Sequence, residues 1–285
     1  MSGTIAVGFF DGVHLGHQKI LSGADEALTF GCHPLSVLAP ERAPRLIMTL
    51  ADRLDAIRAC GVEKVTVLDF TRELANLDPV DFAVRHLAGR HIRCGANWRF
   101  GRDGRGDADF LRKLGYGVSV IPSATFEDAK SSLRQPAEIS STRIRAALEA
   151  GRIGAANAML GRPFAVRGRP FAGKGEGRSL GYPTVNLRPE SLQLRLQLGV
   201  YAVEAAGAMG LANYGYAPTF GGRAWTEPVM EIHFLDAVPE IGGASGPLSV
   251  KLTKFIRPER KFASPEALKA QIEHDVSELR GRGKA

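Results

Sequence analysis

The amino-acid sequence predicts an α/β protein of two domains: a parallel sheet with helices on both faces, then an antiparallel barrel with a terminal helix. Three observations lead to this prediction. The chain has 285 residues, and one domain usually takes about 100–200. Up to about residue 150, short apolar runs alternate with segments of helical spacing. Beyond that point, β-rich runs are separated by glycine and proline turns, which is typical of a small barrel.

In the first half, short apolar runs predict buried strands, and apolar residues at positions such as 50, 54 and 57 follow a helical period. The expected strands are residues 4–10, 27–30, 64–70, 91–95 and 117–122. The expected helices are residues 17–27, 49–60, 79–87 and 107–114. Strands that alternate with helices in this way indicate a parallel sheet.

The pattern changes near residues 152–162, and we place the two domains at 1–155 and 156–285. Residues 141–161 are expected to be helical, with Gly151 and Gly161 as stops. The expected strands of the second domain are residues 165–168, 198–207, 211–216, 229–235 and 248–256. A last helix is expected from Pro265 to Leu279, with Ser264 as its N-cap.

Composition limits the partners. The formal net charge of +7 favours anionic partners, but the basic residues are dispersed and not interleaved with aromatics, so we expect no nucleic acid. The three cysteines contain no CxxC pair and suit a reducing cytosol. With no signal peptide or long apolar run in the sequence, we expect a cytoplasmic chain with no membrane partner.

The stretch GFFDGVHLGHQ (8–18) follows an expected strand and opens an expected helix. In a parallel sheet this is the carboxyl edge, where ligands bind. Glycines let backbone N–H groups approach phosphate, and His14 and His17 can donate to phosphate oxygens as charge develops. A zinc site is an alternative, although HExxH spacing and a nearby third ligand are absent. Two partly exposed turn histidines are the simplest alternative.

Two further stretches carry phosphate-binding chemistry. In ISSTRIR (139–145), two hydroxyls and the planar Arg143 fork at a helix start can hold phosphates, with a plain helix cap as the alternative. GKGEGRSLGYPTVNL (173–187) combines a glycine-rich loop with Thr184 and Asn186. These two residues alternate along a strand, so both oxygens face one side and suit Mg²⁺ bound with a nucleotide. A simple turn is the alternative for the loop.

These stretches resemble motifs of one family. The opening motif resembles the HxGH signature of nucleotidyltransferases and, in its longer form, the bacterial bifunctional riboflavin kinase/FAD synthetase family. Residues 31–34 (GCHP), 95–107 (GANWRFGRDGRGD) and 139–145 resemble further motifs of its first module. GYPTVN (181–186) is similar to the riboflavin kinase G-[FY]-PTAN motif, and residues 199–204, 213–220, 230–236 and 255–264 agree in order.

The resemblance implies a Rossmann-like nucleotidyltransferase domain followed by a six-stranded antiparallel barrel with a terminal helix. It also implies ATP-dependent phosphorylation of riboflavin to FMN, then adenylylation of FMN to FAD with release of pyrophosphate. ATP is the co-substrate, Mg²⁺ the metal, and FMN and FAD are substrate or product. The partners are thus small molecules, and we expect a monomer or weak homo-oligomer.

The resemblance also implies roles for individual residues. Glu231 becomes the general base of the kinase, while His14, His17 and Arg143 act on the ATP phosphates of the adenylyltransferase. Thr184 and Asn186 hold the metal, and Asn97, Phe100 and Arg257 lie near flavin. The implied ATP- and phosphate-binding residues are Gly8, Phe10, Asp11, Gly16, Ser141, Thr142, Gly173, Gly175, Gly177 and Thr184.

Three departures from the family pattern keep alternatives open. The segment after His17 is short, TFGCHP stands where the family commonly has TFDPHP, and residues 240–250 replace a usual LYG. One alternative is a riboflavin kinase alone, with a degenerate N-terminal nucleotide-binding module. Another is a flavin- or nucleotide-binding regulatory protein without turnover, although a binder needs no general base such as Glu231.

Overall fold

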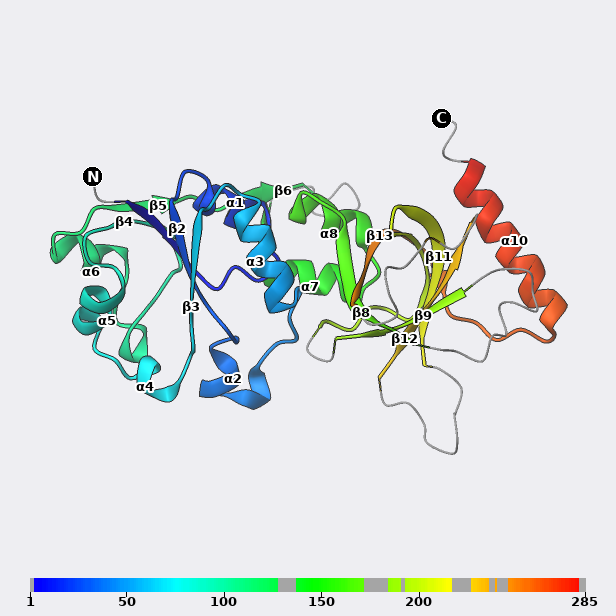
Figure 1. Ribbon diagram of the computed structural model, residues 1–285, viewed down its shortest axis with the longest axis horizontal. Helices are drawn as coiled ribbons and strands as arrows, with labels where there is room; N and C mark the ends of the chain where they lie inside the picture. Colours follow the sequence, from blue (N-terminus) through cyan, green and yellow to red (C-terminus); the bar gives the residue numbers. More distant parts are fainter. Residues whose placement is uncertain are drawn as a thin grey trace. The chain divides into compact units, whose positions relative to one another are not determined.

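The computed structural model forms two compact units, residues 1–143 and 144–285 (Figure 1). The structure describes residues 3–127, 137–171, 184–190, 193–216, 227–235, 239 and 246–281. The domain boundary predicted at residues 155/156 falls within a helix of the second unit, Ile153–Leu160, and remains a prediction.

The first unit contains a five-stranded, all-parallel sheet in the order β3-β2-β1-β4-β5. Its strands are β1 (Thr4–Val7), β2 (Glu26–Phe30), β3 (Lys64–Leu68), β4 (His91–Gly95) and β5 (Val118–Ile121). Successive residues of a strand point to opposite faces. Accordingly, Ile5 and Val7 join one buried cluster with Phe82, whereas Ala6 joins a second cluster with Ile57. The predicted parallel sheet, buried on both faces, is confirmed.

Helices on both faces supply these two clusters. They are α1 (Leu15–Leu21), α2 (Leu35–Leu38), α3 (Leu50–Arg58), α4 (Arg72–Ala75), α5 (Pro79–His86) and α6 (Ala108–Lys113), with 3₁₀ turns at Pro40–Arg42 and Arg102–Gly104. A small antiparallel pair, β6 (Thr125–Phe126) and β7 (Ala137–Glu138), precedes α7 (Ser141–Glu149) and α8 (Ile153–Leu160).

Two sequence-based boundaries are wrong. The strand expected over 4–10 ends at Val7, since the next residues form a turn with positive φ at Phe10 and Gly12. The helix expected over 17–27 ends at Leu21, before a left-handed Gly23. The two stops expected within residues 141–161 are confirmed: α7 and α8 are separated at Gly151, which has φ +66°, and Gly161 ends α8.

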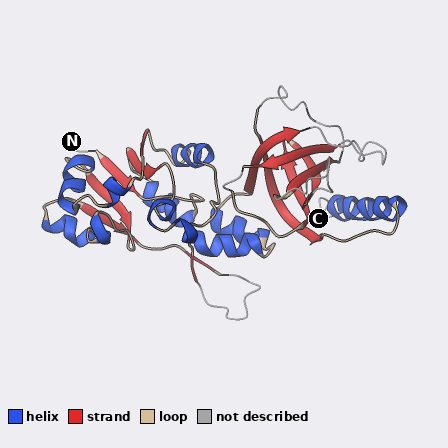
Figure 2. Cartoon of the chain, turned by 90° about the horizontal axis from the view of Figure 1, so that it is seen from below, coloured by secondary structure: helices blue, strands red, loops and turns tan. Residues whose placement is uncertain are grey.

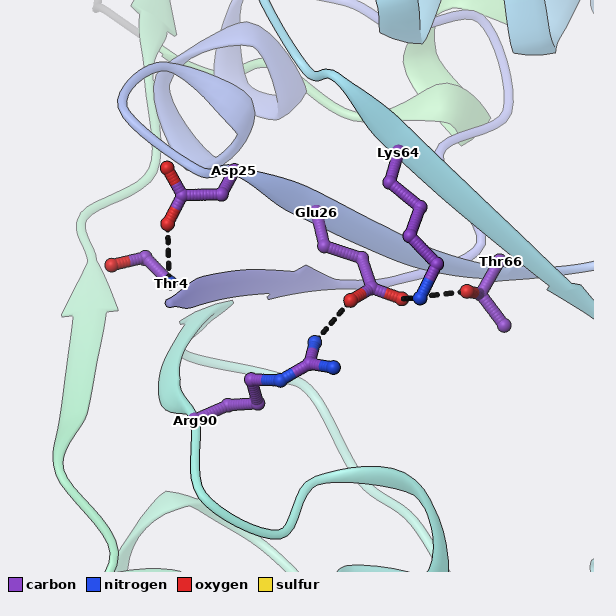
Figure 3. A network of polar contacts seen from close by, with 6 residues as sticks. All are labelled: Thr4, Asp25, Glu26, Lys64, Thr66 and Arg90. Atoms are coloured by element: carbon purple, nitrogen blue, oxygen red, sulfur yellow. Dashed lines mark hydrogen bonds and ion pairs between the residues drawn. The ribbon is translucent and has the colours of Figure 1, made fainter. Parts of the chain in front are cut away.

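At the amino edge of the sheet, Glu26 ties strands together (Figure 3). Its carboxylate, in a residue 7% exposed, accepts hydrogen bonds from Thr66 Oγ1 at 2.6 Å and from Arg90, and pairs with Lys64 Nζ at 3.0 Å. Burial by itself would raise the pKa of Glu26, but these three partners lower it below its ordinary value. This network joins β2, β3 and the chain entering β4, so it stabilises the edge opposite the HxGH turn.

The second unit is a closed barrel of six strands in the order β10-β11-β12-β9-β8-β13 (Figure 2). Its strands are β8 (Phe164–Phe171), β9 (Thr184–Pro189), β10 (Gly199–Ala205), β11 (Ala208–Gly215), β12 (Val229–Phe234) and β13 (Leu248–Pro258). Every pairing is antiparallel. Leu187, Met230 and Tyr214 lie opposite one another on three strands and are all buried. The predicted barrel is confirmed.

The terminal helix α10 (Pro265–Gly281) follows the barrel. The Ser264 hydroxyl accepts the Ala267 N–H at 3.3 Å, which confirms the predicted N-cap. Among the described helices, none combines the length and apolar character that a membrane crossing requires.

Candidate active sites

The backbone of the FDGVH turn is strained. Phe10 has φ +57° and Val13 has φ +39°, both in the left-handed region, and Gly12 between them has φ +84°. A β-branched residue such as Val13 adopts this conformation only at a cost of roughly 1–3 kcal/mol. Such a turn keeps its shape because contacts around it hold it, and this sequence provides several.

Partners from three parts of the chain fix the turn. The buried Thr29 hydroxyl donates to the Phe9 carbonyl at 3.0 Å, and the Ser141 hydroxyl donates to the Asp11 carbonyl at 2.9 Å. The Asp11 carboxylate, in a residue 2% exposed, accepts the Ile47 N–H at 3.1 Å and the Met48 N–H at 3.3 Å. Asp11 therefore anchors the turn to the segment before α3.

His14 and His17 form a stacked pair at the start of α1. Their ring centroids are 3.6 Å apart with an interplanar angle of 18°. His14 Nδ1 accepts the His17 backbone N–H at 3.3 Å, so neutral His14 carries its proton on Nε2, which can donate to a phosphate oxygen. Nearly parallel rings do not converge on one metal ion. In the described part of the chain, no three His, Cys, Asp or Glu side chains gather as a metal site.

Two glycines of the motif are required by packing. A Cβ at Gly8 would lie 2.9 Å from the Phe10 ring, and one at Gly16 would lie 3.1 Å from His14 Cε1. Phe10 also contacts the His17 ring edge-on, with centroids 5.4 Å apart. Glycine at both positions thus lets Phe10 and the two imidazoles pack as one block.

The start of α7 lies against this turn. Ser140 Oγ accepts the Arg143 N–H at 3.3 Å and so caps the helix. Ser141 donates its single hydroxyl proton to the Asp11 carbonyl, so Ser141 links the two motifs. Thr142 and Arg143 are exposed at the helix start. The structure therefore brings the predicted residues of ISSTRIR and HxGH into one neighbourhood.

An apolar cavity of about 300 Å³ opens at the carboxyl ends of β2 and β3. Phe30 ends β2, and its ring meets Phe70 edge-on with centroids 5.2 Å apart. The other lining residues are Pro34, Leu38, Leu74, Ala75, Asn76, Phe82, Arg99, Phe100, Gly101, Asp103 and Gly104. The sequence pointed to Phe100, which also belongs to the core, and to Asn97, which is exposed and outside this lining.

Sequence reasoning missed Phe30 and Phe70 as cavity residues. Each lies at or just beyond the carboxyl end of a parallel strand, where ligands bind in such sheets. An aromatic residue at two successive strand ends was therefore the signal that could have identified them.

In the barrel, strand register brings the predicted kinase residues together. Glu231 of β12 lies directly opposite Asn186 of β9, and His233 lies opposite Thr184. On its other side, Glu231 lies opposite Asn213 of β11. Since directly paired residues share a face of the sheet, a carboxylate and two amides form one row. Asn213 and His233 were not predicted as site residues, although cross-strand pairing selects them.

His233 is a buried imidazole beside this row. Within the described residues, its Nδ1 is buried and has no hydrogen-bond partner. Burial lowers the pKa of His233 to about 4, so the side chain is neutral near pH 7. Gly173, Gly175 and Gly177, predicted to bind phosphate, lie outside the described residues.

Arg257, predicted to cover flavin, lies at the end of β13 opposite Val200. Its Nε donates to Asp275 of α10 at 2.9 Å, and the Asp275 side chain is only 3% exposed. Its guanidinium carbon is 5.6 Å from the centroid of the Phe262 ring. In this structure Arg257 thus fastens the terminal helix to the barrel.

A Rossmann-like sheet with an HxGH turn, joined to a six-stranded barrel with a carboxylate–amide row, defines a two-module nucleotide-dependent transferase. The FAD synthetase family model matches residues 2–143, and the riboflavin kinase family model matches residues 160–282. The bifunctional riboflavin kinase/FMN adenylyltransferase of Escherichia coli strain K12 is 35% identical over 292 residues, or 95% of this chain and 90% of that protein. The chain belongs to this bifunctional family.

Two further proteins are similar to this chain over nearly its whole length. The Bacillus subtilis strain 168 protein of the same description is 33% identical over 297 residues, or 96% of this chain and 90% of that protein. A crystal structure described as a macrolide-efflux protein from Streptococcus pneumoniae has a TM-score of 0.82 and 30% identity, covering 98% of this chain and 94% of that one. The likeness extends over both modules.

Proposed function

We propose that this chain phosphorylates riboflavin to FMN in its barrel and adenylylates FMN to FAD in its N-terminal unit, using ATP in both steps. The observation that carries the proposal is the pair of sites on one chain. One is the row of Glu231, Asn186 and Asn213, with Thr184 two residues from Asn186 on the same strand, and the other is the stacked His14–His17 pair at the carboxyl edge of the parallel sheet.

In the kinase step, the riboflavin 5′-hydroxyl attacks the γ-phosphorus of ATP, the bond from that phosphorus to the β–γ bridging oxygen breaks, and ADP leaves. Glu231 orients this hydroxyl and takes its proton as the new O–P bond forms. Thr184 and Asn186 offer uncharged oxygen atoms from one strand, a donor set that suits Mg²⁺ already carried by ATP phosphates. When bound there, Mg²⁺ supplies charge neutralisation of those phosphates.

In the adenylyltransferase step, the FMN phosphate attacks the α-phosphorus of ATP and pyrophosphate leaves. His14, through Nε2, and His17 donate to phosphate oxygens and stabilise the negative charge that develops. Arg143, exposed at the start of α7, supplies a planar fork for the same phosphates. The apolar cavity beside Phe30 and Phe70 accommodates the flavin ring, because its walls are mostly aromatic and aliphatic, with Asn76, Arg99 and Asp103 as polar groups.

A chromatographic time course tests both steps together. Purified chain with riboflavin, ATP and Mg²⁺ should yield FMN and then FAD. A His14→Asn, His17→Asn double variant should stop at FMN, and Glu231→Gln should convert supplied FMN to FAD but leave riboflavin unchanged. FMN that accumulates in wild-type protein, even when FMN is supplied directly, would support the kinase-only alternative.

We also propose that the chain works in the cytoplasm as a monomer or weak homo-oligomer, with riboflavin, FMN and ATP as its partners. Cys32, Cys60 and Cys94 form no disulfide with one another, which suits a reducing compartment. Cell fractionation and size-exclusion chromatography with light scattering test these two points.

A further inference from the structure

Arg53 is a buried arginine that the proposed chemistry does not use. It lies on α3 with 1% of its surface exposed and is among the largest fully buried side chains of the chain. Burying a charged group is unfavourable unless it is paired and hydrogen-bonded. An apolar side chain would fill this position at a lower cost in folding free energy. Stability alone therefore does not account for an arginine here.

The Arg53 guanidinium joins two segments at the carboxyl edge of the sheet. Its central carbon lies 4.1 Å from the centroid of the Phe9 ring, in the strained turn that leads to the histidines. Its Nη2 donates to the Phe30 carbonyl at 2.5 Å, at the end of β2. Phe30 also lines the apolar cavity. One side chain thus contacts the histidine turn and the rim of the cavity.

The charge of Arg53 is only partly compensated. Burial lowers the pKa of Arg53 to about 10, while the nearby Asp11 and Cys32 favour its charged form, so it remains a cation at neutral pH. Within the described residues, Nε and Nη1 are buried without a hydrogen-bond partner. Each unsatisfied buried donor destabilises the folded state. Arg53 therefore lowers the stability of the fold, and it does so at a position that links two parts of the site.

We propose that Arg53 is a positioning residue for adenylyl transfer, fixing the turn that carries His14 and His17 relative to the cavity that receives the flavin. The inference rests on the proposed adenylyltransferase activity. Arg53 is too deeply buried to contact a substrate, so it acts through Phe9, Asp11 and Phe30. A displacement of about 1 Å between reacting groups can lower a rate roughly 100-fold. A side chain that holds the histidine turn and the cavity in register therefore maintains the rate.

The test compares three variants of the full chain: Arg53→Met, Arg53→Lys and, as matched control, Arg58→Met on the same helix. The Arg58 side chain is 54% exposed and pairs only with Asp55 of its own helix. For each variant, kcat and KM for ATP and FMN are measured in FAD formation. Riboflavin phosphorylation and the thermal unfolding midpoint are measured on the same preparations.

Arg53→Met should lower kcat of FAD formation about 10- to 100-fold, with KM for ATP changed less than about threefold, because ATP contacts are retained. Its unfolding midpoint should stay the same or rise, since two unpaired donors are removed. Arg53→Lys should restore part of kcat, because an ammonium can still donate to the Phe30 carbonyl. Arg58→Met should behave as wild type.

Several outcomes would overturn the proposal. If Arg53→Met lowers the unfolding midpoint and kcat together, and Arg53→Lys rescues neither, Arg53 is only a structural residue. Unchanged kcat in Arg53→Met would exclude a positioning role. Wild-type protein that forms no FAD would instead contradict the proposed adenylyltransferase itself, so the two failures are distinguishable.

Discussion

The hydroxyl of Ser141 donates a hydrogen bond to the backbone carbonyl of Asp11 at 2.9 Å, across 130 positions of sequence. This contact joins the start of α7 to the strained turn that leads to His14 and His17. Two motifs that are far apart in the sequence thus act as one structure, and the first prediction tests that link.

Ser141→Ala should lower FAD formation about 2- to 10-fold, which corresponds to a lost hydrogen bond worth about 0.5–1.5 kcal/mol. The rate of FAD formation from FMN and ATP is the measurement, and riboflavin phosphorylation is the internal reference. Ser140→Ala is the control, because it removes only the helix cap on the Arg143 N–H. An equal loss in both variants would show that α7 stability, and not the link to Asp11, limits the rate.

The apolar cavity predicts a substitution that separates flavin from nucleotide binding. Ala75→Trp should fill space beside Phe30 and Phe70. It should raise KM for FMN at least about tenfold, because the indole takes up space in which the flavin would make apolar contacts. KM for ATP should hardly change. Val84→Trp is the control, because Val84 on α5 is 59% exposed and lies outside the cavity lining. A rise in KM for ATP alone would place the nucleotide, and not the flavin, in this cavity.

In the barrel, Glu231→Gln keeps the size of the side chain but removes the proton acceptor. Riboflavin phosphorylation should fall about 10²- to 10⁴-fold, while FAD formation from supplied FMN stays unchanged. Glu204→Gln on β10 is the control, because Glu204 pairs with Lys251 at the barrel surface. Unchanged phosphorylation in Glu231→Gln would remove this carboxylate from the mechanism.

His233 predicts a pH dependence of stability. Burial lowers its pKa from 6.5 to about 4 in the folded state, so below pH 6.5 the unfolded chain binds a proton that the folded chain does not. The stabilising contribution is present above pH 6.5 and is lost as the pH falls towards 4. Between pH 7.5 and pH 5 the loss amounts to about 2 kcal/mol.

Denaturant unfolding of wild type and His233→Gln at both pH values checks this expectation. The wild-type free energy of unfolding should fall by about 2 kcal/mol more than that of the variant. His274→Gln is the control, since His274 on α10 is exposed and should track wild type. Equal pH dependence in wild type and His233→Gln would mean that this imidazole is not buried in solution.

The local sequence pattern was sufficient to predict most of the strands and helices of the fold. The central strand β1 and its neighbour β2 follow from short apolar runs, because strands that are buried on both faces are mostly apolar. The N-cap of α10 follows from Ser264 before Pro265, a purely local preference. Predictions failed where a backbone conformation decided the boundary: positive φ at Phe10 and Gly12 ends β1 early, and left-handed Gly23 ends α1 early.

The residues of the candidate sites also fall into two groups, those that the sequence predicted and those that only the structure revealed. His14, His17, Thr184 and Asn186 are visible in the sequence because their chemistry and spacing are local, whereas Glu231 was predicted only from the resemblance to the family. Cross-strand register was needed to place Asn213 opposite Glu231 and His233 opposite Thr184, since strand pairing depends on residues far apart in the chain. The aromatic walls of the cavity were likewise missed, because each wall belongs to a different strand end.

By itself, the sequence determined the order of the two modules, the alternation of their elements and the polar groups available for phosphate transfer. Only the tertiary structure decided how those groups are held. The Ser141 link to Asp11 and the burial of Arg53 beneath Phe9 both depend on contacts between distant segments. Burial and geometry arise when the chain is folded, whereas residue type and spacing are fixed before it folds.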